Sequence, residues 1–439
     1  MRARLVKGFS AQAFSQLVSI VIQLTSVPLF LSLWGKDLYG EWLLLTAIPT
    51  YFSMSDFGFG DAAGTEMTLL TARGDRAGAL RVFQSAWLII SAASFSVCAL
   101  ALLTVQFLPI TTWLHLSLIS SGQARWVFCL MTLQIVLSQQ GGLFAAVYRC
   151  EGNFAVGTLY ANAERFGSFL LMAGAVVLGG NPVAVAAAGL SGWVIGNTFT
   201  FLDTRRRSGW LRYGWSEARW ETIKKLSVPA VAYLGLPIGS ALSLQGITLV
   251  IGTLFGPATT VLFITSRTLS RLAWQAINAV TNTIAVELSN AFGQSDIDRA
   301  RKLHRQNFRV AIIMGVSLSG FMFFAGKTIF FYWTHNKITF NPSLFSLMAF
   351  DAILVALWTV SGNVTRSLNK HGMQVFYFAC LSAFSIAMSF YTSRYYGING
   401  ILYASIVSNI LMLCFVLYQA LKYTNDTIGS FAKGVLQIK

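Results

Sequence analysis

The residues of this sequence best suited to chemistry form a polar stripe inside an apolar segment. Arg267, Arg271, Gln275, Asn278 and Asn282 follow one another at spacings of four, four, three and four. These spacings place all five side chains on one face of a helix. A charged side chain costs about 2.5 to 3.5 kcal/mol at the centre of a membrane helix, so we do not expect this face to contact lipid.

The two arginines of the stripe are predicted to lie near the middle of a membrane. Arg267 is about seven residues and Arg271 about eleven residues from the predicted outer end of the segment, and each helical residue advances about 1.5 Å. Guanidinium groups bind phosphate through paired hydrogen bonds. The stripe therefore predicts a substrate-binding site for a phosphate or pyrophosphate in a water-filled cavity, with Gln275, Asn278 and Asn282 as further ligands. In the alternative interpretation, each arginine pairs with a buried acid and only holds helices together.

Arg165 is a second predicted phosphate ligand, in the apolar segment 158–179. Its alternative role is a salt bridge through the neighbouring Glu164. Lys327 and Asp351 lie near the predicted outer ends of their segments, where they can reach the membrane surface. We assign these two residues no function.

The elements that must position these residues are membrane-spanning helices. Of the 439 residues, 55% are hydrophobic and 11% are charged, whereas a soluble domain averages about 25% charged residues. Apolar stretches recur at the length of about 20 residues that a helix needs to cross a membrane. The sequence predicts an all-α membrane protein with about twelve transmembrane helices, at 9–34, 41–70, 83–108, 126–147, 158–179, 183–203, 228–254, 260–290, 308–331, 344–366, 374–393 and 397–421.

The formal net charge of +16 is unevenly distributed among the loops. If the N-terminus is cytoplasmic, the outer loops contain only Lys36, Arg125, Lys337 and Arg394 as basic residues. Retention of Lys and Arg on the cytoplasmic side therefore predicts a multi-pass protein with both termini in the cytoplasm. The charge reflects topology, and nucleic acid is not a predicted partner.

The longest polar stretch divides six predicted helices from six. We expect an N-terminal six-helix lobe at 1–204, a cytoplasmic amphipathic linker at 205–226 and a C-terminal six-helix lobe at 227–439. Within the linker, Trp210, Tyr213, Trp215 and Trp220 alternate with basic residues, which is typical of a segment on the inner leaflet. The alternative is a plain linker whose charges only enforce topology.

The two halves are predicted to be a parallel pseudo-repeat. An ungapped offset of 221 residues aligns Trp34-Gly35 with Phe255-Gly256, Glu66 with Glu287, Asp75 with Asp296 and Ala79 with Ala300. The same offset places Thr46, Thr50 and Asp61 opposite Arg267, Arg271 and Asn282. We therefore expect this face of the second helix to line the same cavity. Asp56 corresponds to Ile277 and is expected to point into the packed lobe, beside the run GFG.

Signatures of enzymes and metal sites do not occur in the sequence. It contains no phosphate-binding Gly-rich loop with Lys, no His-Glu zinc helix and no nucleophile with its base. Its four histidines and five cysteines are isolated. We predict no catalytic residues, no metal and no cofactor.

Residues 33–75 carry a resemblance to a known family. Gly35, Tyr39-Gly40, Trp42, the step Asp56-Phe57-Gly58 and the loop at Asp75 resemble the polysaccharide-transporter branch of the multidrug/oligosaccharidyl-lipid/polysaccharide (MOP) exporter superfamily, and specifically a Wzx-type flippase. The resemblance extends over the whole chain as layout, including the loop GQSDIDRARKLHR.

The resemblance implies two six-helix lobes of MATE-like fold around a cationic cavity in the bacterial inner membrane. Lipid-linked oligosaccharides, with undecaprenyl pyrophosphate as the carrier, would cross from the cytoplasmic to the periplasmic leaflet for surface polysaccharide synthesis. Arg267, Arg271 and Arg165 would bind the pyrophosphate, and Asp61 or Asp56 would take part in ion coupling. Membrane lipid and a polysaccharide polymerase with its export machinery are the implied partners.

Three other functions fit the layout less well. A MATE-like drug exporter would favour an acidic, aromatic cavity over two arginines on one face. A membrane-embedded glycan polymerase or ligase would need a sizeable periplasmic loop, whereas the longest predicted outer loop is about 17 residues, near 109–125. A membrane partner without transport of its own would use the polar stripes only for helix packing.

Overall fold

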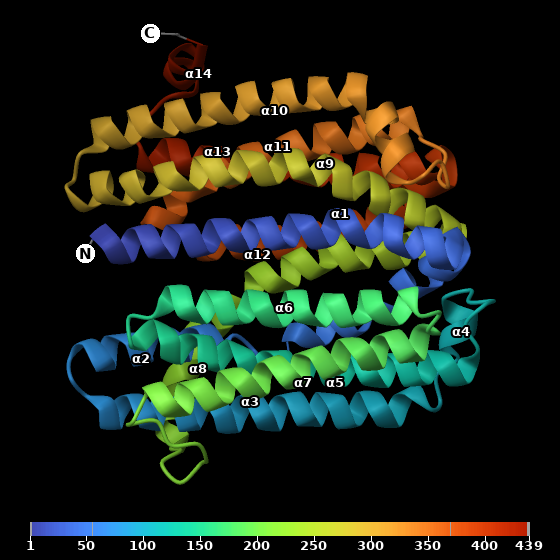
Figure 1. Cartoon of the computed structure of the whole chain (residues 1–439). Coiled ribbons are helices and arrows are strands. Elements are labelled where there is room, and N and C mark those ends of the chain that lie inside the picture. The colour runs from blue at the N-terminus through green and yellow to red at the C-terminus, as the bar shows by residue number, and fades with distance from the viewer. Residues whose placement is uncertain (1, 55, 369, 437–439) are drawn as a thin grey trace. The chain divides into compact units, whose positions relative to one another are not determined.

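The computed structural model describes residues 2–54, 56–368 and 370–436. Its description of side chains further excludes helical residues 2–13, 54, 61, 72, 228–229, 232–234, 236–237, 279–283, 285–286, 289–290 and 293. The described chain is helical and divides into two compact units, Met1–Pro237 and Ile238–Lys439. Figure 1 shows its helices coloured along the sequence.

The first unit is a bundle in which α5 packs against α2, α3, α6 and α7, and α6 also packs against α1. Several helices begin at side-chain caps, which satisfy backbone N–H groups that have no partner within the helix. Ser120 and Gln123 form a capping box at the start of α5, and Asn181 caps α7. The elements are α1 (Arg2–Ala47), the 3₁₀ helix η1 (Pro49–Met54), α2 (Phe59–Ala72), α3 (Arg76–Val105), α4 (Ile110–Trp113), α5 (Ser121–Cys150), α6 (Phe154–Val177), α7 (Pro182–Arg207) and α8 (Trp220–Ala241).

The second unit is built around α9, α11 and α13. Helix α11 packs against α9, α10 and α13, and α12 packs against α13. The elements are the π-helical turn η2 (Leu242–Gly246), α9 (Ile247–Gly293), α10 (Ile297–Trp333), α11 (Pro342–Ser367), α12 (Gly372–Tyr396), α13 (Ile398–Tyr423) and α14 (Ile428–Leu436).

Nine segments of the described chain are long and apolar enough to cross a membrane. Two of them, Phe14–Ser53 and Ile238–Asn278, contain a glycine kink, and each overlaps two of the helices predicted from the sequence. The predicted helix 158–179 corresponds to α6, which is not among these nine segments of the described chain. The prediction of an all-helical, multi-span membrane protein is confirmed.

Two residue pairs that the 221-residue offset aligns have matching local structure. Gly35 has φ 74° and ψ 177°, and Gly256 has φ 80° and ψ 177°; each bends a long helix. Asp75 accepts a hydrogen bond from the Gly78 amide at the start of α3, and Asp296 accepts one from the Arg299 amide at the start of α10. The two halves of the sequence therefore build the same bend and the same cap.

The second predicted helix, 41–70, is not continuous, so this prediction was wrong in detail. Helix α1 ends at Ala47, where Pro49 removes a backbone N–H donor, and η1 follows. Phe57 and Gly58 then adopt left-handed conformations, with φ 49° and 74°. At the aligned position in the second unit Ser270 replaces Pro49, and α9 continues without a break.

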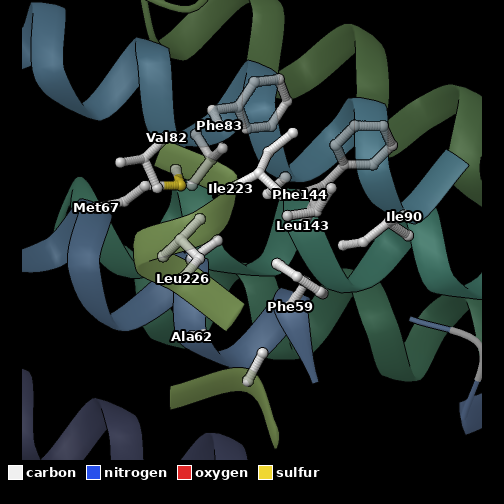
Figure 2. Packing of buried hydrophobic residues seen from close by; sticks show 14 of the residues in the cluster. Phe59, Ala62, Met67, Val82, Phe83, Ile90, Leu143, Phe144, Ile223 and Leu226 are labelled. Atoms are coloured by element: carbon white, nitrogen blue, oxygen red, sulfur yellow. The ribbon is translucent and has the colours of Figure 1, made fainter. Parts of the chain in front are cut away.

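The connector between α7 and α8 packs on the first unit. Leu211 is buried in a cluster with residues of α2, α3, α5 and α8, and Tyr213 packs against that cluster. Figure 2 shows part of this cluster, including Met67, Phe83 and Leu226. Gln84 and Ser85, both buried on α3, bind the backbone of the connector at Arg212, Glu217 and Arg219. Residues 208–219 are thereby fixed to α3. Their predicted place on the inner leaflet stays a prediction.

The short helix α14 docks on α10 of the second unit. The Arg305 guanidinium donates to Asp426 at 2.7 and 2.8 Å, and Arg309 donates to the carbonyl oxygens of Gly434 and Val435 at 2.5 and 2.7 Å. The Phe431 ring stacks on the His304 ring at 5.0 Å between centroids. Two arginines of α10 thus bind both ends of the C-terminal segment.

The docking of α14 should depend on pH through Asp426. Burial opposes ionisation of this carboxyl, but hydrogen bonds from Arg305, Ser430 and the Thr427 amide lower its pKa below the usual value. A carboxyl with a lowered folded pKa stabilises the fold above its unfolded pKa, about 3.9, and this contribution is lost as pH falls through the folded pKa. We expect hydrogen exchange of α14, corrected for intrinsic rates, to be slow at pH 7 and to accelerate below about pH 4.

The variant Asp426→Asn provides the control for this pH effect. Losing a charged acceptor costs about 1.5 to 3 kcal/mol, so exchange in α14 should be at least about tenfold faster at pH 7. The difference from the wild type should shrink at acid pH. Identical exchange profiles for the two proteins would contradict the role of Asp426.

Candidate functional site

The polar stripe lies on the part of α9 that follows the kink at Gly256. The positive φ of Gly256, 80°, ends the first part of the helix, and Pro257, whose φ suits a first helical turn, begins the second. At about 1.5 Å per residue, Arg267 and Arg271 lie roughly 16 and 22 Å along the helix from this kink. Both arginines lie within the candidate membrane span Ile238–Asn278, and their position near the middle of the membrane stays a prediction.

Arg267 is held by the π-helical turn η2. Its Nη1 donates to the Leu244 carbonyl oxygen at 3.0 Å, and its Nη2 donates to the Thr248 hydroxyl at 3.3 Å. A π-turn shifts the backbone hydrogen-bond pattern, and such turns often occur at functional sites. The guanidinium carbon also lies 5.6 Å from the centroid of the Phe263 ring. Polar neutral groups therefore orient Arg267.

Arg271 lies one turn further along α9 and is partly exposed. Its guanidinium carbon is 5.3 Å from the centroid of the Trp274 ring. Within the described residues, neither Arg271 nor Arg267 forms an ion pair with an acid, and Arg271 donates no hydrogen bond. In the alternative interpretation, a buried acid neutralises each arginine. The described part of the chain contains no such pair.

Of the remaining three residues of the stripe, the structure describes the side chains of two. Gln275 and Asn278 lie on the same helical face by their spacing and are partly exposed. The side chain of Asn282 lies outside the described residues. The structure thus places Arg267, Arg271, Gln275 and Asn278 on one helix, and their role as phosphate ligands stays a prediction.

Arg165 is an exposed residue on α6 in the first unit. Its neighbour Glu164 is buried and accepts a hydrogen bond of 2.5 Å from the Asn197 side chain on α7. Gly196 permits this contact, because a Cβ atom there would lie 2.4 Å from Glu164. Among the described residues, no salt bridge joins Arg165 and Glu164, which was the alternative role of Arg165. Glu164 instead joins α6 to α7.

Of the two carboxyls predicted for ion coupling, only Asp56 has a described side chain. Asp56 is partly buried, and its Oδ1 accepts a hydrogen bond of 3.1 Å from the Gly58 amide in the break before α2. This contact stabilises the turn at Phe57 and Gly58. Asp61 lies on α2, with its side chain outside the described residues. Ion coupling by Asp56 or Asp61 stays a prediction.

Asp351 was assigned no function from the sequence, but the structure places it in a hydrogen-bond network. On α11, its two carboxylate oxygens accept from the Ser405 hydroxyl at 3.1 Å and the Asn409 amide at 2.8 Å, both on α13. The Asn409 Oδ1 accepts from the Trp358 indole at 3.1 Å. Asp351 thus joins α11 to α13. Distant sequence positions supply its partners, and a pattern within one helix does not reveal them.

A small polar cavity lies beside this network in the second unit. It has a volume of about 30 Å³, sufficient for one water molecule, and serine and asparagine side chains contribute much of its lining. Ser408 is buried there, and within the described residues its hydroxyl has no hydrogen-bond partner. The polar lining residues are Ser243, Ser382, Ser385, Ser405, Ser408 and Asn409.

Arg366 on α11 is a further partly buried arginine of the second unit, and sequence reasoning missed it. Its Nη2 donates to the Thr359 carbonyl oxygen and to the Asn363 side chain, each at 2.7 Å. The predicted helix ended at this residue, which suggested a loop position. Both acceptors of Arg366 lie on its own helix, α11, so it differs from Arg271, which keeps its donors available.

Known proteins resemble this chain in structure but not in sequence. No family model and no curated protein sequence matches the chain. The fold is similar to that of an inward-facing multidrug-resistance MATE transporter of the MOP superfamily, with a TM-score of 0.75, 11% identity and coverage of 94% of this chain and 99% of that one.

Two further solved structures extend this likeness. The lipid II flippase MurJ in an inward closed conformation gives a TM-score of 0.73 at 14% identity, covering 98% of this chain and 90% of that one. A MOP superfamily transporter from Pyrococcus furiosus gives 0.59 at 12% identity, covering 96% and 94%. The chain is thus a multi-pass membrane protein with the fold of MOP superfamily transporters. These neighbours are transporters, not enzymes.

Proposed function

We propose that this protein is a flippase for undecaprenyl-pyrophosphate-linked oligosaccharides, acting in the bacterial inner membrane with both termini in the cytoplasm. It moves the lipid-linked repeat unit from the cytoplasmic to the periplasmic leaflet, where a polysaccharide polymerase and export machinery use it. The observation that carries this proposal is Arg271, which lies within the candidate membrane span Ile238–Asn278 and has no acidic partner among the described residues.

The two arginines have different parts in substrate binding. Arg267 uses two of its five N–H donors on Leu244 and Thr248, so its position is set before substrate arrives. Arg271 offers all five donors and makes the stronger contact with the pyrophosphate. Gln275 and Asn278 bind neighbouring oxygens of the pyrophosphate or of the first sugar.

A drug exporter of the MATE type is the second candidate, because a MATE transporter has a TM-score of 0.75 with this chain. The charge of the stripe disfavours it. A cationic drug would be repelled by Arg267 and Arg271, whereas an anionic pyrophosphate is attracted to them. A glycan polymerase or ligase is disfavoured as well, because the outer segment between α3 and α5 is short and contains only the four-residue α4.

Depletion of the protein in its native host tests the proposal. We expect an undecaprenyl-pyrophosphate-linked oligosaccharide to accumulate on the cytoplasmic leaflet, to be identified by mass spectrometry of extracted lipid, while surface polysaccharide falls. Complementation with the wild-type chain should reverse both effects. Normal surface polysaccharide together with increased drug sensitivity would instead support the exporter.

A further inference from the structure

A cleft of about 630 Å³ lies in the first unit, whereas the arginine stripe belongs to the second. Three helical segments form it: α2, the start of α3, and the start of α8 with the end of the connector. Its volume is in the range of small-molecule sites, about 300 to 1,000 Å³. The lining residues are Ala62, Thr65, Glu66, Leu70, Asp75, Gly78, Arg81, Val82, Arg219, Glu221, Thr222, Lys225 and Leu226.

Charges of both signs line the cleft. Its three basic residues are Arg81, Arg219 and Lys225, and all three are exposed. Glu66 and Glu221 are exposed carboxylates, while Asp75 accepts the Gly78 amide at 2.7 Å. Within the described residues none of these six side chains forms an ion pair. The cleft therefore offers separate cationic and anionic groups to a ligand.

Buried polar residues of α3 fix the position of one of these cations. The Arg219 amide donates to the Ser85 hydroxyl at 2.9 Å, and the Glu217 amide donates to the Gln84 side chain at 2.6 Å. Ser85 and Gln84 are 0% and 1% exposed. The backbone that carries Arg219 is thus held against α3, so binding a ligand there would not require ordering the connector.

Beneath the charges the cleft is apolar. Ala62, Val82 and Leu226 line it and belong to the buried cluster shown in Figure 2. Leu70 extends this surface. A ligand that matches the cleft combines a charged group with an apolar portion, which is the character of a lipid and not of a free soluble metabolite.

The cleft also lies where a membrane surface is expected. The candidate membrane span of α3 begins at Arg76, next to Asp75 of the cleft. Trp215 and Trp220, in the connector and at the start of α8, are 74% and 73% exposed. Exposed tryptophans at the end of a membrane helix are typical of the headgroup region.

We propose that this cleft binds the headgroup of a membrane phospholipid carrying both a phosphate and a primary ammonium, as phosphatidylethanolamine does. Arg219, Lys225 and Arg81 bind the phosphate. Glu66 and Glu221 accept hydrogen bonds from the ammonium, and the glycerol with the first acyl carbons lies on Val82 and Leu226. An anionic lipid satisfies the basic side chains but leaves the two glutamates facing a negative ligand.

Native mass spectrometry of the purified full-length protein with added lipid tests the proposal. We expect phosphatidylethanolamine to bind at least about fivefold more tightly than phosphatidylglycerol, which lacks the ammonium, or phosphatidylcholine, whose ammonium has no N–H donor. Soluble glycerophosphoethanolamine should compete weakly because it cannot use the apolar floor. Equal binding of the three lipids, or full competition by the soluble headgroup, would overturn the proposal.

Matched variants separate this site from general attraction to basic residues. Arg219→Ala with Lys225→Ala should weaken phosphatidylethanolamine binding by about tenfold, whereas Arg212→Ala with Lys224→Ala, which removes the same charges outside the cleft, should change it by less than twofold. Glu66→Gln with Glu221→Gln should reduce the preference over phosphatidylglycerol. Equal effects of the two double alanine variants would contradict a defined site. This readout does not require transport, so it is independent of the flippase proposal.

Discussion

Replacement of Arg271 by alanine is expected to reduce export of the lipid-linked oligosaccharide by about 100-fold, with normal levels of protein in the membrane. Truncating one partner of a desolvated charge pair costs about 2 to 5 kcal/mol. Arg271 makes no hydrogen bond or ion pair with the described residues, so its loss should leave the fold intact. Export is measured as the initial rate of surface polysaccharide labelling.

Two further variants make the Arg271 result specific. Arg271→Lys keeps the charge but loses the paired geometry of the guanidinium, and it should retain part of the export. Arg394→Ala removes an exposed arginine at the end of α12 and should leave export unchanged. Unimpaired export with Arg271→Ala would contradict the proposal that the stripe binds the substrate.

Replacement of Gly256 or Gly35 by alanine is expected to have the largest effect on stability. Both glycines combine a φ near 75 to 80° with a ψ of 177°, a region that residues with a Cβ atom rarely enter. An added Cβ would meet no atom within 4 Å at either position, so the cost is backbone strain alone. At about 2 to 3 kcal/mol, this strain should lower the apparent melting temperature in detergent by roughly 5 to 10 °C.

Helical glycines provide the controls for this measurement. Gly174 in α6 and Gly320 in α10 also have no atom within 4 Å of an added Cβ. Alanine at these sites should leave the melting temperature unchanged or raise it, because glycine is the weaker helix former by about 1 kcal/mol. If Gly256→Ala unfolds at the same temperature as Gly320→Ala, the kink does not depend on glycine.

The fold was largely predictable because its determinants are local and repetitive. Apolar stretches of membrane length predicted the helices, and the offset that aligned Gly35 with Gly256 and Asp75 with Asp296 predicted elements with matching geometry. The break at Pro49 was missed because the apolar pattern continues through it. The break results from a missing N–H donor and two left-handed residues, and a hydropathy pattern records neither of these features.

The candidate site was predictable only in part. Spacing along one helix correctly grouped Arg267, Arg271, Gln275 and Asn278, since helical periodicity fixes which residues share a face. The Leu244 carbonyl that holds Arg267 lies in a π-turn 23 residues away in sequence. The partners of Asp351 lie more than 50 residues away, on α13. Contacts between helices of this kind require the packed structure.

The central claim is that a pyrophosphate-linked glycolipid crosses the membrane by binding the free guanidinium of Arg271. The most direct measurement is transfer of a fluorescent undecaprenyl-pyrophosphate oligosaccharide between leaflets of proteoliposomes, detected by the access of an external glycosidase. Wild-type protein and Arg394→Ala should both increase the transfer rate over protein-free liposomes, and Arg271→Ala should return it to the protein-free rate. Equal transfer by the wild type and Arg271→Ala, or none above protein-free liposomes, would contradict the account.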